Sequence, residues 1–388
     1  MNSSAPGDAG LLRLANPVRT YAWGSRTTLA ALRRRTCPSP EPEAELWIGA
    51  HPAAPSRIAA GPDLPAAIAA DPRGLLGPGR DRLPFLLKIL AVAAPLSIQV
   101  HPDAARAAAG FAREEARGLA RDDPARNYRD DWPKPELVCA LSRFEALCGF
   151  REPGEAAYLL REPRGPRLDR VADALAQGGP AAAFALLDAW PAEDRPALVA
   201  EVRGGSAGAH GVAARIARDR PDDPGCVAAL LLNLVVLRPG QGLYVRPRTV
   251  HAYLHGTAVE IMASSDNVLR GGLTAKHVDR AEFAAVADFA PAAPEVVEPE
   301  RTRAGEELYP APVRQFRLTR LCPLPSVAIT DPGPSAIVCV EGSVEVLRDG
   351  HAERLNSGEA VFVPYGGGRE LVVEGDGLAF RASAPPPA

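Results

Sequence analysis

The stretch Leu237–Tyr253 reads LRPGQGLYVRPRTVHAY, and Leu355–Pro364 reads LNSGEAVFVP. Both contain a polar turn with glycine, followed by a short apolar run that ends in valine. A proline comes within two positions of that valine. Short strands between glycine turns are typical of antiparallel sandwiches and barrels. The two stretches therefore predict two small β-barrels of one type, and the similar pattern of Ser335–Ser383 extends the second barrel.

Other strand-like segments lie outside these stretches. Leu46–Gly49, Pro84–Leu90 and Leu96–Val100 are short apolar runs bounded by proline, glycine or polar residues. Such runs favour strands or other short buried segments. The run Ala229–Leu237 has the same character and predicts a further strand.

Helical patterns occur in two places. Residues 103–119 predict a helix that Asp103 caps at its start. From about residue 153 to 224, apolar residues recur at intervals of three and four, which predicts a small helical subdomain inserted into a β-rich body. Its periodic segments are Glu155–Arg161, Leu168–Ala176, Ala181–Ala189 and Arg195–Val202.

The expected fold is therefore mainly β with a helical insertion. Residues 1–152 together with 226–289 are expected to form the first β-domain, with the helical subdomain at 153–225. A second β-domain is expected at 290–388, and its Pro-, Ala- and Glu-rich start, Ala290–Glu300, is expected to be a linker.

The composition excludes several classes of protein. The 388 residues carry 44 basic and 47 acidic side chains, so the net charge of −3 predicts no general attraction to nucleic acid or to an anionic membrane. The first ten residues lack the apolar stretch of a signal peptide, and no window is apolar enough to span a membrane. The six cysteines include no C-x-x-C pair and are expected to be reduced thiols of a cytoplasmic protein.

Gln99-Val100-His101 is the first candidate for a site. Side chains two apart on a strand point to the same face, so Gln99 and His101 would face one cavity while Ile98 and Val100 pack on the other side. The alternative is a polar pair with satisfied hydrogen bonds beside a core.

Two further segments offer polar groups at strand-like positions. Lys134-Pro135-Glu136 leads into an apolar run, and a carboxylate at the start of such a strand indicates a site. The alternative is ordinary surface charge at a strand end. In Val250–Gly256, alternation would bring His251, Tyr253 and His255 to one face. Such groups are costly to bury unpaired, which favours a site over a plain apolar core.

Gln99, His101, Glu136 and His251 together offer two oxygens and two imidazole nitrogens. This donor set suits zinc, with manganese, cobalt or iron as possible substitutes.

The densest polar stretch, Glu260–Lys276, follows directly. It contains Glu260, Asp266, Arg270 and Lys276. Carboxylates bind hydroxyl groups or move protons, and Arg and Lys bind phosphate, so the stretch suits an anionic polyhydroxy substrate. A solvated loop is the alternative.

These residues resemble a known family, the type I mannose-6-phosphate isomerases of the cupin superfamily. The resemblance covers about residues 16–152 and 228–280, and the helical insert and the C-terminal part match only in type. The matching motifs are Tyr21–Gly24, Ala44–Pro52, Leu96–Pro102, Lys134–Glu136, Leu147–Arg151 and His251–Lys276.

The resemblance implies a cupin or jelly-roll catalytic barrel followed by a second, cupin-like β-domain. It implies zinc at Gln99, His101, Glu136 and His251, and interconversion of mannose 6-phosphate and fructose 6-phosphate through a cis-enediol. The small sugar phosphate would be the partner of a monomer or weak oligomer. The implied catalytic residues are Arg270, Glu260, Lys134 and Asp266, and the implied substrate-binding residues are Ser97, Lys88, Tyr253 and Lys276.

One departure from the family pattern concerns proton transfer. The family commonly has Asn-His before the Lys-Pro-Glu triplet, whereas this chain has Trp132-Pro133. If that histidine serves ring opening, another group must replace it here, and His255 is one candidate. Two other functions remain open: a cupin that binds a sugar phosphate without turnover, and a metal-dependent cupin of other chemistry such as an oxygenase.

Overall fold

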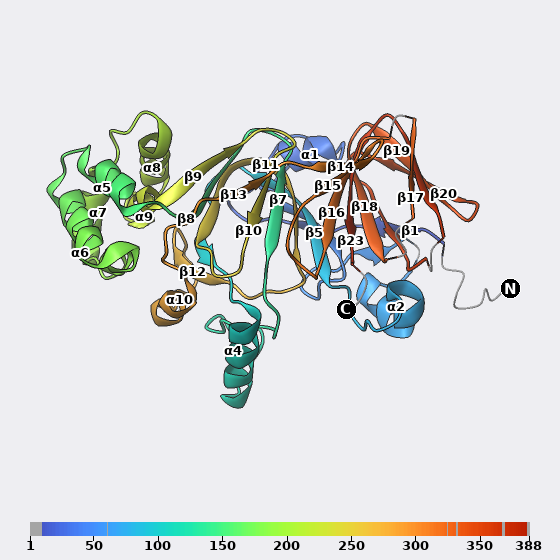
Figure 1. The fold of residues 1–388 in the computed structure, drawn as a ribbon, viewed down its shortest axis with the longest axis horizontal. Helices are drawn as coiled ribbons and strands as arrows, with labels where there is room; N and C mark the ends of the chain where they lie inside the picture. The colour runs from blue at the N-terminus through green and yellow to red at the C-terminus, as the bar shows by residue number, and fades with distance from the viewer. Residues whose placement is uncertain (1–9, 60, 324, 331–332, 367–368, 386–388) are drawn as a thin grey trace.

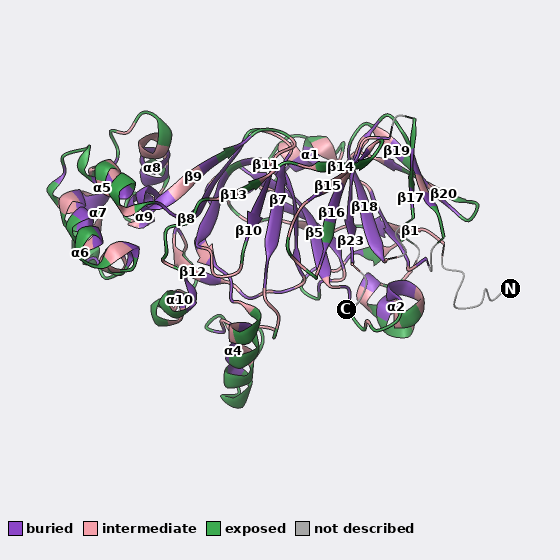
Figure 2. Cartoon of the chain, viewed as in Figure 1, coloured by how far each residue is buried: buried purple, intermediate pink, exposed green. Residues whose placement is uncertain are grey.

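The computed structural model describes residues 10–59, 61–323, 325–330, 333–366 and 369–385. Strands fill the middle and one end of the elongated molecule, and a group of helices forms the other end (Figure 1). The strands in the middle are mostly buried, whereas the helices expose their outer faces (Figure 2). Among the described residues, no helix has the length and apolar character that a membrane crossing requires.

One sheet forms the middle of the molecule, and all its strands pair antiparallel. Its eleven strands are β2 (Val18–Arg19), β3 (Glu45–Gly49), β5 (Phe85–Val92), β6 (Ile98–Val100), β7 (Glu136–Ala140), β8 (Phe144–Phe150), β9 (Leu232–Leu237), β10 (Gly242–Val245), β11 (His251–Ala263), β12 (Leu269–Gly272) and β13 (Glu295–Val297).

The long strand β11 joins the two parts of this sheet. Its first residues pair with β6 and β8, and its later residues pair with β5 and β7. Gly256 lies where the partners change, at a φ of +118°, and a Cβ there would be 2.6 Å from the carbonyl oxygen of Arg143. Glycine therefore allows one strand to serve both parts.

Two further sheets form the strand-rich end of the molecule. The eight-stranded sheet contains β1 (Leu12–Ala15), β4 (Arg57–Ile58), β14 (Glu300–Arg303), β15 (Glu306–Tyr309), β16 (Arg317–Leu321), β18 (Ser335–Glu341), β21 (Ala360–Val363) and β23 (Leu378–Ser383). The four-stranded sheet contains β17 (Ser326–Ile329), β19 (Ser343–Arg348), β20 (His351–Asn356) and β22 (Leu371–Gly375).

The eight-stranded sheet has an apolar core on each face. On one face, residues such as Ile337 and Val361 pack with Val346 and Val373 of the four-stranded sheet. On the other face, residues such as Phe362 belong to the same buried cluster as apolar side chains of β3 and β5. The eight-stranded sheet is thus the middle layer between the first sheet and the four-stranded one.

The helices occupy two kinds of position. Those outside the insert are α1 (Thr28–Leu32), α2 (Leu64–Ala70), α3 (Pro72–Leu76), α4 (Ala104–Ala116) and α10 (Arg280–Val286). The insert contains α5 (Pro153–Arg161), α6 (Pro166–Asp188), the short 3-10 helix η1 (Ala192–Asp194), α7 (Arg195–Ala200), α8 (Gly208–Asp219) and α9 (Gly225–Leu231).

The insert packs against the outer face of the strands that lead to the site. Its core includes Ile98 and Val100 of β6 and Ala252 and Leu254 of β11, all buried. The expected packing of Ile98 and Val100 opposite Gln99 and His101 is confirmed. The insert therefore supports these strands from behind.

The mainly β fold with a helical insertion is confirmed. Asp103 caps α4 as expected, because its side chain accepts a hydrogen bond from the backbone of Arg106. The periodic segments expected at 168–176 and 181–189 both lie in α6, which breaks at Gly178 and Gly179 before Pro180. A glycine at positive φ followed by a proline ends one helix and begins the next.

Two local expectations were wrong. Residues 229–231 belong to α9, and only 232–237 form a strand. All seven residues of α9 are buried, so this helix has no polar face and its apolar run looks like a buried strand. The stretch 290–300, expected to be a linker, contains β13, which pairs with β10. The sequence pattern also gave no prediction of α8.

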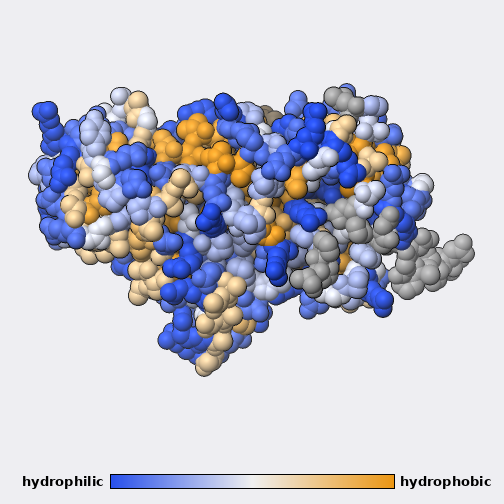
Figure 3. All heavy atoms as spheres, viewed as in Figure 1, coloured by the Kyte–Doolittle hydropathy of each residue, from blue (hydrophilic) through white to orange (hydrophobic). Residues whose placement is uncertain are grey.

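The surface differs between the middle of the molecule and its helical end. Apolar atoms are exposed over the middle of the face shown in Figure 3, whereas hydrophilic atoms cover much of the helical end. Val236 of β9 and Val296 of β13 are among the exposed large apolar residues.

Candidate metal centre and active site

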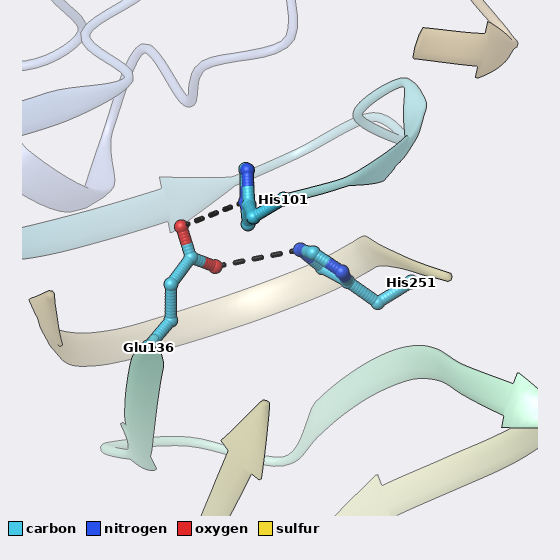
Figure 4. Close-up of side chains that lie close together, drawn as sticks. All are labelled: His101, Glu136 and His251. Atoms are coloured by element: carbon cyan, nitrogen blue, oxygen red, sulfur yellow. Dashed lines mark ion pairs between the residues drawn. The ribbon is translucent and has the colours of Figure 1, made fainter. Parts of the chain in front are cut away.

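His101, Glu136 and His251 meet where three strands begin or end. His101 follows β6, and Glu136 and His251 are the first residues of β7 and β11. Their side chains point toward one another (Figure 4), with Glu136 Oε1 3.1 Å from His101 Nε2 and Oε2 3.4 Å from His251 Nε2. All three residues are at most 2% exposed. Pro102 and Pro135 place His101 and Glu136 at strand ends, since proline interrupts the pairing.

The hydrogen bonds of the two imidazoles fix which nitrogen faces the centre. His101 Nδ1 lies 2.7 Å from the carbonyl oxygen of Asn267, and His251 Nδ1 lies 2.9 Å from that of Thr249. A carbonyl oxygen only accepts, so each Nδ1 carries the proton, and in the neutral form of each ring the lone pair of Nε2 points toward Glu136.

This arrangement requires a positive charge between the three groups. Burial, together with Lys134, lowers the pKa of His101 to about 4, so the ring is neutral at neutral pH. The Nε2 atoms of His101 and His251 are buried and have no hydrogen-bond partner among the described residues. Two unpaired nitrogen lone pairs beside a carboxylate fit a metal cation, and the three ligand atoms lie within 4.8 Å of one another.

Gln99 lies next to this cluster in register. It stands opposite His251 of β11 and opposite Arg270 of β12, and its side chain is half-buried. The pairing brings the backbones of Gln99, His251 and Arg270 together, as expected for one site.

Lys134 and Tyr253 surround the carboxylate of Glu136. Lys134 Nζ is 3.1 Å from Glu136 Oε1, and the Tyr253 hydroxyl donates to Oε2 over 3.3 Å. Burial raises the pKa of Glu136, but the neighbouring ammonium group of Lys134 outweighs burial and holds that pKa well below the usual value. Glu136 is therefore ionised, as a metal ligand must be.

A second buried cluster, Lys88, Glu260, Glu45 and Trp47, lies on the paired strands β3, β5 and β11. Lys88 Nζ is 3.1 Å from Glu260 and 3.8 Å from Glu45, and Trp47 donates to Glu45 over 2.6 Å. Burial, with Glu136 and Glu45 nearby, raises the pKa of Glu260 despite Lys88. Glu45 and Trp47 were missed as site residues, although both lie in the Ala44–Pro52 motif.

Arg129, Arg270 and Lys276 form a cluster of cations. Burial and the neighbouring Arg129 lower the pKa of Arg270, and burial and Arg270 lower that of Lys276. The side chain of Arg270 makes no hydrogen bond or ion pair with any residue that the structure describes. Lys276 lies over the ring of Tyr21 at 5.3 Å. These charges repel one another, so an anion between them would be stabilised. Sequence reasoning did not single out Arg129, which lies close enough to Arg270 and Lys276 to lower the pKa of both.

Ser97 and His255 complete the expected residues. Ser97 is half-buried in the turn before β6. His255 is exposed, unlike His251 and Tyr253, because the register of β11 against β8 shifts between Tyr253 and His255. The simple alternation expected for this segment therefore ends at Tyr253, and the suggestion that His255 serves ring opening is not supported.

Asn267 ties the loop before Lys134 to the metal centre. Its side-chain oxygen accepts from the backbone of Arg129 over 2.8 Å, and its side-chain nitrogen donates to the carbonyl oxygens of Asp130 and Trp132 over 2.8 and 2.9 Å. Its own carbonyl oxygen is the one that orients His101. The Trp132 ring lies under Arg82, with 3.4 Å from Cζ to the ring centroid.

Comparisons with known proteins agree on one family. The family model "Phosphomannose isomerase type I, catalytic domain" matches residues 11–153. Mannose-6-phosphate isomerase of Escherichia coli is 38% identical over 369 residues, which cover 90% of this chain and 94% of that protein. Mannose-6-phosphate isomerase 1 of Arabidopsis thaliana is 29% identical over 91% of this chain and 89% of its own.

Solved structures agree with the sequence comparison. Mannose 6-phosphate isomerase from Salmonella typhimurium, bound to its substrate F6P and to zinc, superposes with a TM-score of 0.89 at 34% identity. The match covers 97% of this chain and 100% of that one. A zinc-bound form superposes equally well, at 35% identity.

Proposed function

The chain belongs to the type I phosphomannose isomerases, and we propose that it interconverts mannose 6-phosphate and fructose 6-phosphate with a bound zinc ion. The observation that carries the proposal is the pair of buried, unpartnered Nε2 atoms that face the ionised Glu136. A centre of this kind has no stabilising interaction for its lone pairs without a cation.

His101, Glu136 and His251 would hold the zinc ion, and Gln99 would be its fourth ligand. Gln99 shares a strand face with His101 and stands opposite His251. When bound, zinc polarises the substrate carbonyl and stabilises negative charge that develops on the substrate oxygens.

Glu260 takes the proton from C2 of the open-chain aldose and returns it to C1 of the cis-enediol. A proton on carbon requires a stronger base than an ordinary carboxylate, and the pKa of Glu260 is raised by burial. Its partner Lys88, 3.1 Å away, holds it in place. Lys134 is the alternative base, but its ammonium group is already paired with Glu136.

The phosphate group of the substrate binds among three cations, Arg129, Arg270 and Lys276. Arg270 and Lys276 carry charges that their neighbours leave unbalanced, and Arg129 adds a third. Ser97, in the turn before β6, offers a hydroxyl group. Arg270 also stabilises negative charge that develops in the transition state. Tyr253 holds the carboxylate of Glu136 and borders the substrate.

The chain is organised around this site. Residues 1–152 with 226–289 form the catalytic cupin domain, 153–225 the inserted subdomain and 290–388 a cupin-like domain that stabilises the first. Two short strands cross this division, since β1 pairs with β21 and β13 with β10. The enzyme acts in the cytoplasm as a monomer or weak oligomer, and its net charge of −3 is in line with the expectation of no nucleic-acid partner. Light scattering of the purified protein measures the oligomeric state.

One experiment tests the reaction itself. The purified chain is analysed for zinc and assayed with mannose 6-phosphate, with fructose 6-phosphate formation coupled to a dehydrogenase. We expect one zinc ion per chain, turnover that a chelator abolishes, and recovery when zinc is added back. Bound zinc with no turnover would instead identify a cupin that only binds sugar phosphates.

A further inference from the structure

Arg129 and Lys276, two cations of the site, lie on different segments of the chain. Arg129 belongs to the first segment, residues 117–135, which connects α4 to β7, and Lys276 belongs to the second segment, residues 273–279, which connects β12 to α10. Neither of these described segments contains a helix or strand. Arg129 is among the charges that lower the pKa of Lys276, after burial and Arg270. Because the cations repel, other contacts must keep the two segments together.

Two side-chain hydrogen bonds join the segments through the start of α10. The Tyr128 hydroxyl donates to Glu282 Oε1 over 2.5 Å. The side-chain amide of Asn127 donates to Asp279 Oδ2 over 2.8 Å. Asp279 also caps α10, since its Oδ1 accepts from the backbone N–H of Glu282 over 3.0 Å. Both bonds therefore attach the first segment to the helix that follows Lys276.

The Tyr128 ring is enclosed as well as hydrogen-bonded. It is fully buried, and it packs against α4 at Gly110, where a Cβ would lie 2.5 Å from the ring. Burial and the hydrogen bond to Glu282 raise the pKa of the Tyr128 hydroxyl, so this group keeps its proton and donates. Glu282 Oε2 also pairs with Arg113 at 3.1 Å, where α4 and α10 lie close together (Figure 1). The ring and the carboxylate are thus held by the same helix.

The backbone of the first segment is fixed on both sides of Arg129. Before it, the buried carboxylate of Glu114 in α4 accepts from the backbone N–H of Tyr128 over 2.8 Å. After it, Asp130 Oδ2 accepts from the backbone N–H of Asp266 over 2.8 Å. Arg129 therefore lies between an anchor to α4 and an anchor to the loop that follows β11.

Contacts of this kind matter because the site gathers like charges. Arg129, Arg270 and Lys276 repel one another when no anion lies between them, and Arg129 and Lys276 lie on irregular segments. If the segments separated in the free protein, an anion would have to bring them back together, and that cost would weaken its binding. Hydrogen bonds that hold the segments in place before binding remove this cost.

We propose that the hydrogen bond between Tyr128 and Glu282 preassembles the cations that receive the phosphate group, and that Tyr128 is a positioning residue for substrate binding. Tyr128 acts through its neighbour Arg129 and, across the bond to Glu282, through the segment of Lys276. The inference rests on the proposed binding of a sugar phosphate at these cations. It concerns affinity rather than the chemical step, because the phosphate group is remote from the carbons that exchange the proton.

The test removes the hydroxyl with Tyr128→Phe in the zinc-loaded enzyme. Affinity is measured as KM for mannose 6-phosphate and as the dissociation constant of inorganic phosphate, from phosphorus NMR. We expect both constants to rise by about threefold to tenfold with kcat changed less than about twofold, because an interaction made equally in the ground and transition states affects KM alone. Glu282→Ala should have the same effect, whereas Glu282→Gln, which keeps an acceptor oxygen, should retain constants close to wild type.

The dependence on salt separates preassembly from general packing. Salt screens the repulsion between the three cations, so segments that are no longer joined should separate less at high ionic strength. The ratio of the Tyr128→Phe to the wild-type dissociation constant for phosphate should therefore fall between about 0.05 M and about 0.5 M sodium chloride. A variant that is only less well packed should give the same ratio at both salt concentrations.

Controls distinguish this inference from a loss of stability and from the proposed function. Tyr309→Phe also removes a buried hydroxyl, one that donates to the backbone of Gly240, and should change neither KM nor the phosphate dissociation constant. Asn127→Ala breaks the second hydrogen bond and should raise both constants even if Tyr128→Phe does not fold.

Unchanged constants in Tyr128→Phe, or in Asn127→Ala where Tyr128→Phe does not fold, would overturn the inference, as would a ratio that does not depend on salt. A wild-type chain that binds phosphate, with weaker binding in Tyr128→Phe but no turnover of mannose 6-phosphate, would refute the isomerase function and leave the inference standing. A wild-type chain that binds no phosphate would overturn both.

Discussion

At the scale of single residues, the orientation of two imidazoles decides what the centre can bind. Backbone carbonyls hold the Nδ1 protons of His101 and His251, so both Nε2 lone pairs face Glu136. Asn267 has two roles in this, since its carbonyl oxygen orients His101 and its side chain holds the loop of residues 129–132. The zinc ligands therefore depend on a residue that touches no metal.

Asn267→Ala tests this dependence. The change leaves the backbone N–H of Arg129 and the carbonyl oxygens of Asp130 and Trp132 without partners. We expect a loss of about 2–3 kcal/mol in the free energy of unfolding and a fall of about tenfold in zinc affinity, measured by denaturation and chelator competition. Asn356→Ala is the control. It removes a side-chain amide of the four-stranded sheet that donates to Glu359, and it should leave zinc affinity unchanged.

Glu260→Gln tests the base on carbon. Because a base must be ionised, wild-type kcat should fall as the pH decreases through the raised pKa of Glu260. The variant should lose about 10²- to 10⁴-fold in kcat at every pH, with its zinc content unchanged. The exposed Glu374→Gln serves as the control, and a Glu260→Gln enzyme with near-wild-type kcat would shift the role to Lys134.

Arg270→Ala tests the cation cluster. Arg270 makes no ion pair with a described residue, so its charge is available to the substrate. We expect kcat to fall about 10²-fold with zinc content unchanged, measured by the coupled assay and metal analysis. Loss of zinc would instead indicate a structural role, and the exposed Arg301→Ala should change neither quantity.

At the scale of elements, β11 brings the site together. It begins with His251 beside β6 and later pairs Glu260 with Lys88 of β5, so one strand carries a metal ligand and the proposed base. The bend at Gly256 makes this possible, because the left-handed φ of +118° excludes other residues without strain.

Gly256→Ala tests the bend. The added Cβ would lie 2.6 Å from the carbonyl oxygen of Arg143 and 2.9 Å from Phe144 Cα. We expect a loss of about 2–3 kcal/mol in the free energy of unfolding, measured by denaturant titration, with a lower zinc occupancy. Gly154→Ala is the matched control, since Gly154 has no atom within 4 Å of the added Cβ and should lose little stability.

At the scale of the whole molecule, the catalytic sheet is stabilised by two neighbours. The C-terminal strands pack against one part of it, and the helical insert packs against another. One buried cluster contains residues of β3, β5 and β11 together with residues of β16, β18 and β23. The Tyr309 hydroxyl donates to the carbonyl oxygen of Gly240 over 2.7 Å, and Cys139 of β7 donates to that hydroxyl over 2.8 Å. We expect the chain to unfold in one transition because the catalytic sheet and the C-terminal strands share one buried cluster.

Tyr309→Phe tests this contact. The change keeps the ring and removes the hydroxyl, so Gly240 and Cys139 lose their partner. The free energy of unfolding should fall by about 1–3 kcal/mol, measured by calorimetry, while the zinc content stays the same. Tyr158→Phe, at a position that is 66% exposed, should have no measurable effect, and two separate transitions in either protein would contradict the shared core.

The sequence by itself determined the architecture and the donor set. Strand alternation placed Gln99 with His101 on one face and Ile98 with Val100 on the other, and prolines at 102 and 135 marked the strand ends. The order of the motifs identified the family. These features are local, since they depend on residues a few positions apart.

Only the tertiary structure decided which polar groups share the site. The ion pair of Lys88 with Glu260, the cations around Arg270, the anchoring by Asn267 and the contact of His51 with Asp266 join residues from separate segments. The register shift that exposes His255 and the buried helix α9 also depend on packing. A pattern along the chain specifies which face a side chain takes, but a distance between segments far apart in sequence is set by how the sheets and the insert pack.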